Sequence, residues 1–417
     1  MNTGIKAAIV LAVTGLAVAA GRPAGQAADP LREQAHRLHR QMLVLDAHAD
    51  LGPFLEMDSM PALITDPGMA GRGYDPSKDP GQAPVVEPWR KLFPPPPWRF
   101  TDRHADEHTY EDLPRMREGG VKAQFVAVYM DREPRPGMAV KRAFDQIDGV
   151  LSVCEKYPQH VGLATTAAEV RRIVDSGRIA LLIGVEGGYM IEDDLRILRL
   201  FNRLGVRYLT LTHSFNTNWA DSSGTGKPVP PIHDGLSPFG REVVAEMNRL
   251  GMIVDITHVS DKTFYDALAV TKAPVIASHS SVDGVKDHPR NLSDDMLRAL
   301  ARNGGVIHID SVIKYIDPVE NRNGTPLSIF IDHVVHALKV AGPDHVGIGN
   351  DYGYDAPRPI GMEDVSKFEE VTYQLLQRGV DEATIRKVWG ENTLRVMTEV
   401  ERVAAKLRQQ AAPTTRQ

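Results

Sequence analysis

The sequence predicts an α/β fold, a (β/α)8 barrel of the TIM type with a long proline-rich insert after its first strand. Short apolar segments of strand length recur along most of the 417 residues, and segments with helical periodicity lie between most of them. Together with the opening strand they make eight β/α units, which is typical of a closed parallel barrel. An open doubly wound sheet is the alternative, but no glycine-rich phosphate motif follows any strand.

The elements follow one another in order. A helix is expected over 29–42, and it leads into a first strand over 43–50. Further strands are expected at 123–128, 179–185, 206–211, 252–256, 275–277, 305–309 and 345–348. Helices are expected at 140–156, 167–176, 193–204, 238–250, 260–270, 293–303 and 329–341. Residues 388–401 have apolar positions at helical spacing near the end of the chain.

The ends of the chain differ from the barrel region. Lys6, an apolar stretch over 7–20 and the small residues after it predict a signal peptide over 1–28, cleaved after Ala20 or near Ala28. We therefore expect an exported protein, periplasmic or secreted; an uncleaved membrane anchor is the alternative. The barrel domain is expected over 29–405, with the insert at about 57–107 and a flexible tail over 406–417.

Composition narrows the possible partners. The chain is 42% hydrophobic and 24% charged, which is ordinary for a globular enzyme. Its formal charge of -6 and the lack of a basic block argue against a nucleic-acid partner. Cys154 is the only cysteine, so an intrachain disulfide and a thiolate metal site are both excluded.

Metal-binding residue types lie at the ends of five of the expected strands. His48 and Asp50 close the first strand with one residue between them, and Glu186 follows the third strand between glycines. A histidine ends each of the next three strands: His213, His258 and His279. Any one of these could be a turn residue or a hydrogen-bonded histidine. As a set at one end of a barrel, they predict a site for two divalent ions sharing a carboxylate, zinc or a similar ion.

Two further residues complete the predicted site. Asp351 ends the last strand, and its natural role there is proton transfer between water and a leaving group. Arg290, just after the sixth strand, could bind a substrate carboxylate through its planar fork, although a surface salt bridge explains its position equally well. His308 ends the seventh strand and could line the pocket.

These residues, in this order, resemble the membrane dipeptidase (renal dipeptidase) family, metallopeptidase family M19 of the amidohydrolase superfamily. The resemblance covers nearly all of the chain after residue 28. Its matching segments are 46–50, 113–121, 184–188, 208–214, 219–221, 255–260, 274–281, 290–291, 347–351 and 389–392.

The resemblance implies a role for each residue. His48, Asp50 and Glu186 would hold one zinc ion, and Glu186, as the bridge, would hold the other with His258 and His279. His213 would polarise the scissile carbonyl, Arg290 would hold the terminal carboxylate, and Asp351 would move the proton. The implied substrate is a dipeptide with a free C-terminal carboxylate, including L-Xaa-D-Xaa. A homodimer is a further family expectation.

Two departures from the family pattern bear on substrate preference. Tyr352-Gly-Tyr354 follows Asp351 where the family often has Phe-Asp-Gly, and the insert is longer than expected. A binuclear amidohydrolase acting on another amide, a lactone or an ester is therefore the alternative function, and an exported non-enzymatic binding protein is a third. With one cysteine and no anchoring tail, the chain looks like a bacterial member.

Overall fold

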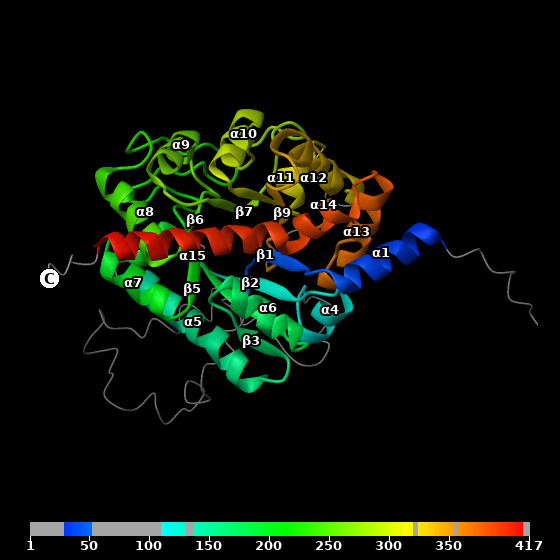
Figure 1. Cartoon of the computed structure of the whole chain (residues 1–417). Helices are drawn as coiled ribbons and strands as arrows, with labels where there is room; N and C mark the ends of the chain where they lie inside the picture. The colour runs from blue at the N-terminus through cyan, green and yellow to red at the C-terminus, as the bar shows by residue number, and fades with distance from the viewer. Residues whose placement is uncertain (1–28, 52–109, 131–136, 320–323, 354–356, 412–417) are drawn as a thin grey trace, which may run out of the picture.

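The computed structural model describes residues 29–51, 110–130, 137–319, 324–353 and 357–411. The predicted signal peptide and proline-rich insert lie outside these residues. Eight parallel strands form a nearly closed barrel, as the sequence predicts (Figure 1). Their order is β1 (Leu45–Ala49), β2 (Ala123–Val128), β4 (Ile179–Glu186), β5 (Val206–Thr210), β6 (Ile253–Asp255), β7 (Ile276–Ser280), β8 (Val306–Ile309) and β9 (Val346–Ile348).

The first and last strands meet at the seam of the barrel. A parallel bridge joins Ala49 to Tyr352, and the backbone N–H of Asp50 donates to the carbonyl of Tyr352 at 2.6 Å. Lower in the seam, the buried carboxylate of Asp46 accepts from the backbone and side-chain amides of Asn350 at 3.0 and 3.1 Å. The ends of β1 and β9 are thereby held in a fixed register beside each other.

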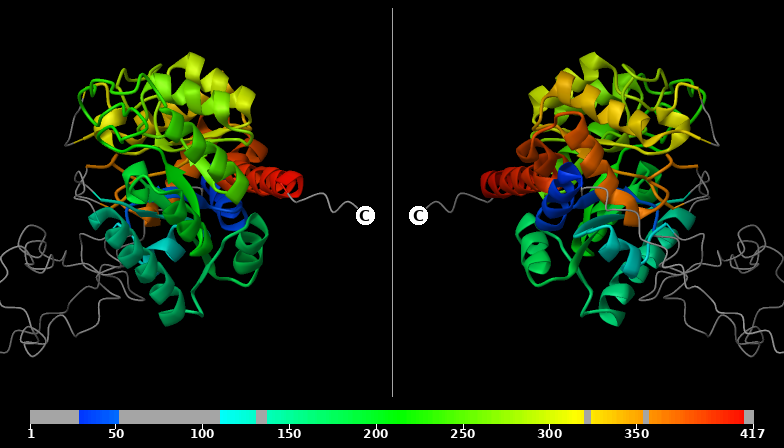
Figure 2. Two further views of the ribbon diagram at one scale, coloured as in Figure 1. Left: turned by 90° about the vertical axis from the view of Figure 1, so that its left-hand side faces the viewer. Right: turned by 90° about the vertical axis from the view of Figure 1, so that its right-hand side faces the viewer.

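Helices surround the barrel on its outer side (Figure 2). The long ones are α1 (Pro30–Gln41), α5 (Met138–Lys156), α6 (Ala167–Asp175), α7 (Leu195–Arg203), α8 (Pro238–Leu250), α9 (Asp261–Val270), α10 (Asp294–Asn303), α12 (Leu327–Ala341) and α13 (Phe368–Gln377). Many begin at an Asp, Ser or Thr whose side chain accepts from the first turn, as Ser237 does for α8 and Ser293 for α10. Among the described residues, no helix has the length and apolar character needed to cross a membrane.

Some elements differ from the expectation. A short strand, β3 (Val161–Leu163), pairs with β4 outside the barrel, and α4 (Leu113–Glu118) precedes β2. Helix α15 (Asn392–Ala411) continues past residue 405, so the prediction of a flexible tail from 406 was wrong up to Ala411. Buried Val400, Val403 and Ala404 hold its second half against the domain, and this packing explains why the helix persists.

Helix α15 closes the N-terminal end of the barrel. In Figure 1 it runs across the strands, and Figure 2 shows it on one side of the barrel only. Its buried residues Leu394, Met397 and Val400 pack with side chains near the strand starts, among them Leu45 and Ile253. The barrel interior is therefore a filled core at this end, and only the C-terminal end is open to carry a site.

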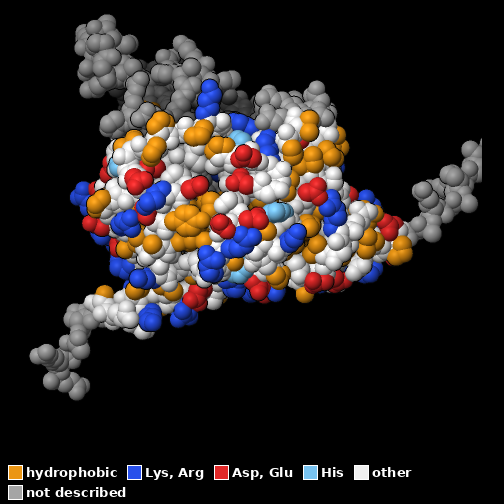
Figure 3. All heavy atoms as spheres, turned by 90° about the horizontal axis from the view of Figure 1, so that it is seen from above, with side chains coloured by type: hydrophobic (Ala, Val, Ile, Leu, Met, Phe, Trp, Pro, Cys, Tyr) orange, Lys and Arg blue, Asp and Glu red, His pale blue; other side chains and the backbone are white. Residues whose placement is uncertain are grey.

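On the face of the molecule that Figure 3 shows, charged side chains of one sign do not gather into a patch. Seen from above, Lys and Arg side chains are interspersed with Asp and Glu side chains over the helices at the top of Figure 1 (Figure 3). Such mixing is typical of a solvated surface.

Candidate metal centre

Glu186, the last residue of β4, lies at the centre of a cluster of buried polar side chains at the C-terminal end of the barrel. Its Oε1 atom is 2.9 Å from Nε2 of His258 and 3.2 Å from Nε2 of His279. Its Oε2 atom is 3.6 Å from Nε2 of His48. The two oxygens of one carboxylate thus face histidines on different sides.

The other predicted site residues surround this carboxylate. Nε2 of His48 lies 3.3 Å from Oδ1 of Asp50 and 3.6 Å from Oδ1 of Asp351. Nε2 of His213 lies 3.7 Å from Oε1 of Glu186. Residues that are far apart in the sequence are therefore brought into one cluster, as the strand-end pattern predicts.

The donor set fits metal ions in number, type and spacing. Three groups have ligand atoms that all lie within 4.8 Å of one another: His48, Asp50 and Glu186; Glu186, His213 and His258; and His48, His279 and Asp351. Nε2 of His258 lies 3.1 Å from Nε2 of His279. Ligands about 2.0–2.1 Å from one tetrahedral ion would lie about 3.3 Å apart, so these nitrogens and Glu186 are spaced for a shared cation.

A β-bulge turns His48 and Asp50 into the barrel. Leu45 and Ala47 pack in the interior core, so strict alternation would point His48 outward. However, the pairing with β2 shifts between Asp46 and Ala49, where β1 has one more residue than its partner. The extra residue reverses the alternation and aims His48 inward. A matching shift in β7 between Ala277 and Ser280 lies beside His279.

His258 is held in an unfavourable backbone conformation. Its φ of 67° lies in the left-handed region, which residues other than glycine rarely adopt. Its carbonyl accepts from the backbone N–H of Ser223 at 2.8 Å and from the hydroxyls of Thr212 at 2.8 Å and Ser222 at 3.1 Å. Several donors on one carbonyl fix this conformation, and strain that is fixed in this way is common at functional sites. Asp351 also has a positive φ, of 57°.

Buried polar residues behind the cluster orient the histidines. The Tyr208 hydroxyl lies 2.8 Å from Nδ1 of His48; in the tautomer with its proton on Nδ1, His48 donates to this hydroxyl and keeps a free lone pair on Nε2. The Ser278 hydroxyl lies 2.9 Å from Nδ1 of His279 and donates to Asp255 at 2.6 Å. Sequence reasoning missed these three residues. Asp255, a carboxylate inside an apolar strand, is the signal that could have revealed the network.

Gly184 makes room for this arrangement. A Cβ atom at this position would lie 1.9 Å from the Tyr208 ring, which occupies the barrel interior. Glycine in the apolar strand β4 therefore has a packing role, two residues before Glu186.

The pKa shifts of Glu186, His258 and His279 favour a bound cation. Burial alone would raise the pKa of the Glu186 carboxyl, but His213, His48 and the bonded histidines outweigh it and hold the pKa well below its usual range. Burial, followed by the neighbouring positive groups, holds the pKa values of His258 and His279 well below normal. An ionised carboxylate and neutral imidazoles are the forms that bind metals.

Arg290 lies beside the cluster with free donors. Its side chain is buried, and Nη2 donates to the carbonyl of His279 at 3.1 Å. Its Nε and Nη1 atoms have no partner among the described residues. The ring of Tyr315 packs 5.2 Å from the guanidinium carbon. Because buried donors are nearly always paired, these two are placed for a ligand.

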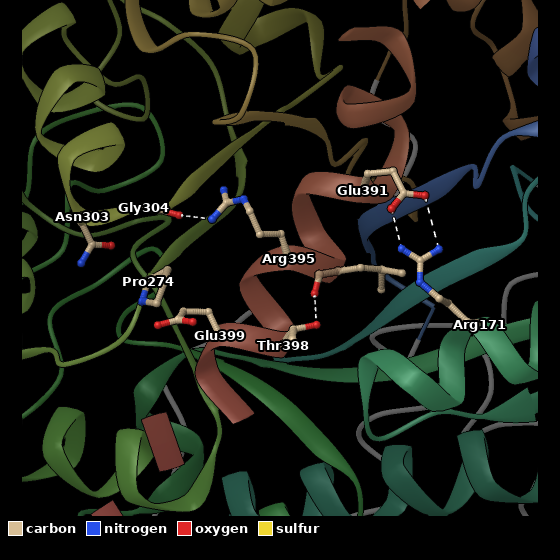
Figure 4. Close-up of a pocket in the computed structure, with 9 residues that line it drawn as sticks. Arg171, Pro274, Asn303, Gly304, Glu391, Arg395, Thr398 and Glu399 are labelled. Atoms are coloured by element: carbon tan, nitrogen blue, oxygen red, sulfur yellow. Dashed lines mark hydrogen bonds and ion pairs between the residues drawn. The ribbon is translucent and has the colours of Figure 1, made fainter. Parts of the chain in front are cut away.

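A second depression lies at the opposite end of the barrel. It has a volume of about 530 Å³ and is lined by residues including Arg171, Asn303, Glu391 and Arg395 (Figure 4). Arg171 pairs with Glu391 at 2.5 Å, and Arg395 donates to the carbonyl of Gly304 at 2.8 Å. The metal-binding residue types of the cluster lie at the other end of the barrel, so the chemistry belongs there.

Comparison with known proteins agrees with this site. The family model for membrane dipeptidases (peptidase family M19) matches residues 32–411. Dipeptidase verJ of Clonostachys rogersoniana is 41% identical over 310 residues, which cover 72% of this chain and 78% of that protein. Because this relative is fungal, a bacterial origin of the chain stays a prediction.

Solved structures share the fold. A metallopeptidase from Rhodobacter sphaeroides, liganded with a phosphinate mimic of the dipeptide L-Ala-D-Ala, is 26% identical with a TM-score of 0.69, covering 86% of this chain and 99% of that one. The probable dipeptidase PvdM from Pseudomonas aeruginosa is 23% identical with a TM-score of 0.73, covering 90% and 99%. The chain belongs to the membrane dipeptidase family, peptidase family M19, and is a metal-dependent dipeptidase.

Proposed function

We propose that the enzyme binds two zinc ions and hydrolyses dipeptides that have a free C-terminal carboxylate. His48, Asp50 and Glu186 would hold one ion, and Glu186, His258 and His279 the other. The observation that carries this proposal is the position of Glu186, whose Oε2 faces His48 while its Oε1 faces His258 and His279. A carboxylate with ligands on both sides is suited to bridge two cations.

Two such ions, when bound, would lower the pKa of a water molecule between them and would polarise the substrate carbonyl. Asp351 would take the proton from the attacking water and pass it to the leaving amine. Burial and the negative charge of Asp50 raise the pKa of Asp351 to about 8, so this carboxyl exchanges protons near neutral pH.

His213 would stabilise the negative charge that develops on the carbonyl oxygen. Burial lowers the pKa of its imidazole, which is therefore neutral and can donate through one nitrogen only. Its ring lies edge-on to His258, with centroids 4.5 Å apart, and its Nε2 is directed toward Glu186. A donor held there would act on the carbonyl during bond cleavage.

Arg290 would bind the C-terminal carboxylate through Nε and Nη1. Both atoms carry N–H groups without a partner among the described residues, and each can donate a charge-assisted hydrogen bond to a carboxylate oxygen. The Rhodobacter relative was solved with a mimic of L-Ala-D-Ala, so an L-Xaa-D-Xaa dipeptide is the first substrate to test. We also propose export through the N-terminal segment, with no stable membrane insertion after its removal, and assembly as a homodimer.

The test combines metal analysis with a panel of L,L and L,D dipeptides. The expected result is close to two zinc ions per chain and cleavage of free dipeptides, with little cleavage of the same dipeptides carrying a C-terminal amide. Equal cleavage of the amides would contradict the Arg290 clamp and favour the broader amidohydrolase alternative. Metal-loaded protein that leaves the whole panel intact would contradict the substrate proposal.

A further inference from the structure

Asp310 is a carboxylate at the catalytic end of the barrel that the proposed reaction does not use. It directly follows β8, on which Val306 packs in the interior core and the His308 ring faces Gly347 of the neighbouring strand. Side chains alternate along a strand, so Asp310 lies on the same inner side, one level above His308 and at the height of the metal cluster. Its backbone N–H donates to the carbonyl of Ser280 at 3.2 Å, next to His279.

His308 itself belongs to the core beneath the pocket. Its ring nitrogens bond the carbonyl of Ala277 and the hydroxyl of Thr393, both at 2.9 Å. With both nitrogens engaged, it has no group left for a ligand, and the polar group that β8 offers to the pocket is Asp310.

One oxygen of Asp310 is buried without a partner. The side chain is fully buried; Oδ1 accepts from the backbone N–H of Val312 at 2.7 Å, while Oδ2 has no hydrogen-bond partner among the described residues. Burial and the charge of Asp351 raise its pKa to about 8, and the charges of Arg358 and Arg290 only partly oppose this. An unpaired buried oxygen is destabilising, and a ligand donor would remove that cost.

Asp310 and Arg290 both lie at the catalytic end of the barrel, and each has side-chain atoms without a hydrogen-bond partner among the described residues. The charge of Arg290 affects the pKa of Asp310. The pKa of the buried Tyr315 hydroxyl is affected by both of these residues and by Asp351 and Glu186. Yet no hydrogen bond joins Asp310 to Arg290, although Arg290 has two free donors and Asp310 a free acceptor. Unpaired donors on one side chain and an unpaired acceptor on the other are suited to a ligand that carries both a carboxylate and an ammonium group.

We propose that Oδ2 of Asp310 accepts a hydrogen bond from the α-ammonium group of the substrate's N-terminal residue. This inference rests on the proposed function, in which Arg290 holds the carboxylate. The two charges of a dipeptide sit on α-carbons about 3.8 Å apart across one peptide unit. Among the carboxylates at this end of the barrel, Asp50 and Glu186 are assigned to the metals and Asp351 to the proton. In the part of the chain that the structure describes, Asp310 is an acid that these roles leave available for the ammonium group.

The experiment measures binding rather than turnover. Zinc-loaded protein is titrated calorimetrically with a phosphinate mimic of Ala-Ala and with the same compound in which hydrogen replaces the amino group. Wild type should bind the amino-bearing mimic about 10- to 100-fold more tightly, the range of a charge-assisted hydrogen bond. The Asp310→Asn variant keeps an oxygen for Val312 and should lose this preference while binding the desamino mimic as wild type does.

The control is Arg290→Ala, which removes the proposed contact to the carboxylate and leaves the proposed contact to the ammonium group in place. It should weaken both mimics and leave the preference for the amino group intact. The inference is overturned if wild type binds the two mimics equally, if Asp310→Asn keeps the preference, or if Asp310→Asn weakens both mimics alike. The dipeptide panel reports on the proposed function separately: cleavage without an amino preference contradicts only the role of Asp310, whereas an amino preference without cleavage contradicts only the proposed reaction.

Discussion

The hydroxyl of Tyr208 lies 2.8 Å from Nδ1 of His48 and fixes the direction in which Nε2 of that imidazole points. Tyr208 is fully buried in the barrel interior, with the missing Cβ of Gly184 leaving space for its ring. The contact ties the packing of the core to the metal site, because a shift of the tyrosine would release the histidine.

Tyr208→Phe should therefore weaken metal binding about 10- to 100-fold, the usual cost of losing a partner behind a histidine ligand. Competition with a chelator measures the affinity. Tyr265→Phe, a change on the exposed face of α9, is the matched control and should have no effect. An unchanged affinity in Tyr208→Phe would mean that packing alone orients His48.

Glu186→Gln should remove metal at both positions, since one carboxylate faces both groups of histidines. The amide replaces an anion by a neutral group and turns one oxygen into a donor that repels a cation. Metal content after gel filtration provides the measurement. Glu192→Gln makes the same chemical change just beyond this strand, where Glu192 accepts from the backbone N–H of Val140 at 3.3 Å, and should retain full metal. Retention of one full equivalent by Glu186→Gln would contradict bridging.

Asp351→Asn should lower kcat by about 10²–10⁴-fold and leave the metal content unchanged, because the amide cannot carry the proton. Asparagine also tolerates the left-handed backbone at this position, where φ is 57°, so the fold should survive. Asp344→Asn, at the other end of the same β/α unit, is the control. Loss of metal together with activity would assign Asp351 to the ligands instead.

The sequence predicts much of this molecule because its informative residues are local. Each barrel strand is a short apolar run, and a metal-binding residue directly after such a run must lie at the C-terminal end of the barrel. That reasoning placed Glu186 and His258 correctly at one cavity without any knowledge of their neighbours. Helix limits such as Ser237 for α8 likewise depend on residues close in the sequence.

The features that sequence reasoning missed depend on contacts between distant segments. The bulge in β1 exists only relative to its pairing with β2, so alternation alone would turn His48 the wrong way. Tyr208 looks like an ordinary strand residue until His48 is placed beside it. Helix α15 is held by buried residues as far as Ala404 that pack against other elements, and its polar last turns concealed its length in the sequence.

Arg290→Ala should raise KM for free dipeptides about 10- to 100-fold and change kcat little, because it removes a charge-assisted contact present before and during the reaction. Amidated dipeptides should be affected much less. Arg298→Ala removes an exposed arginine that pairs with Asp295 at 2.8 Å, and it serves as the control. A KM that remains at the wild-type value for free dipeptides would contradict the clamp.

The buried histidines should make the fold sensitive to acid. His39 is fully buried between the hydroxyl of Thr372 and the carbonyl of Gly119, each 2.7 Å from a ring nitrogen. Burial lowers its pKa to about 4, whereas an unfolded histidine titrates near 6.5. Between these values the unfolded chain binds the extra proton, so stability is complete above about pH 6.5 and is lost as the pH falls toward 4.

For His39 alone this loss amounts to about 3 kcal/mol of the free energy of unfolding. Urea unfolding of metal-free protein at several pH values measures it. His39→Gln, which removes the titrating group, should reduce the fall in stability by about that amount, while His308 and His333, whose pKa values burial also lowers to about 4, sustain the remainder. His36→Gln, an exposed change on the same helix, is the control. A pH dependence identical in wild type and His39→Gln would show that His39 is protonated in the folded protein as readily as in the unfolded chain.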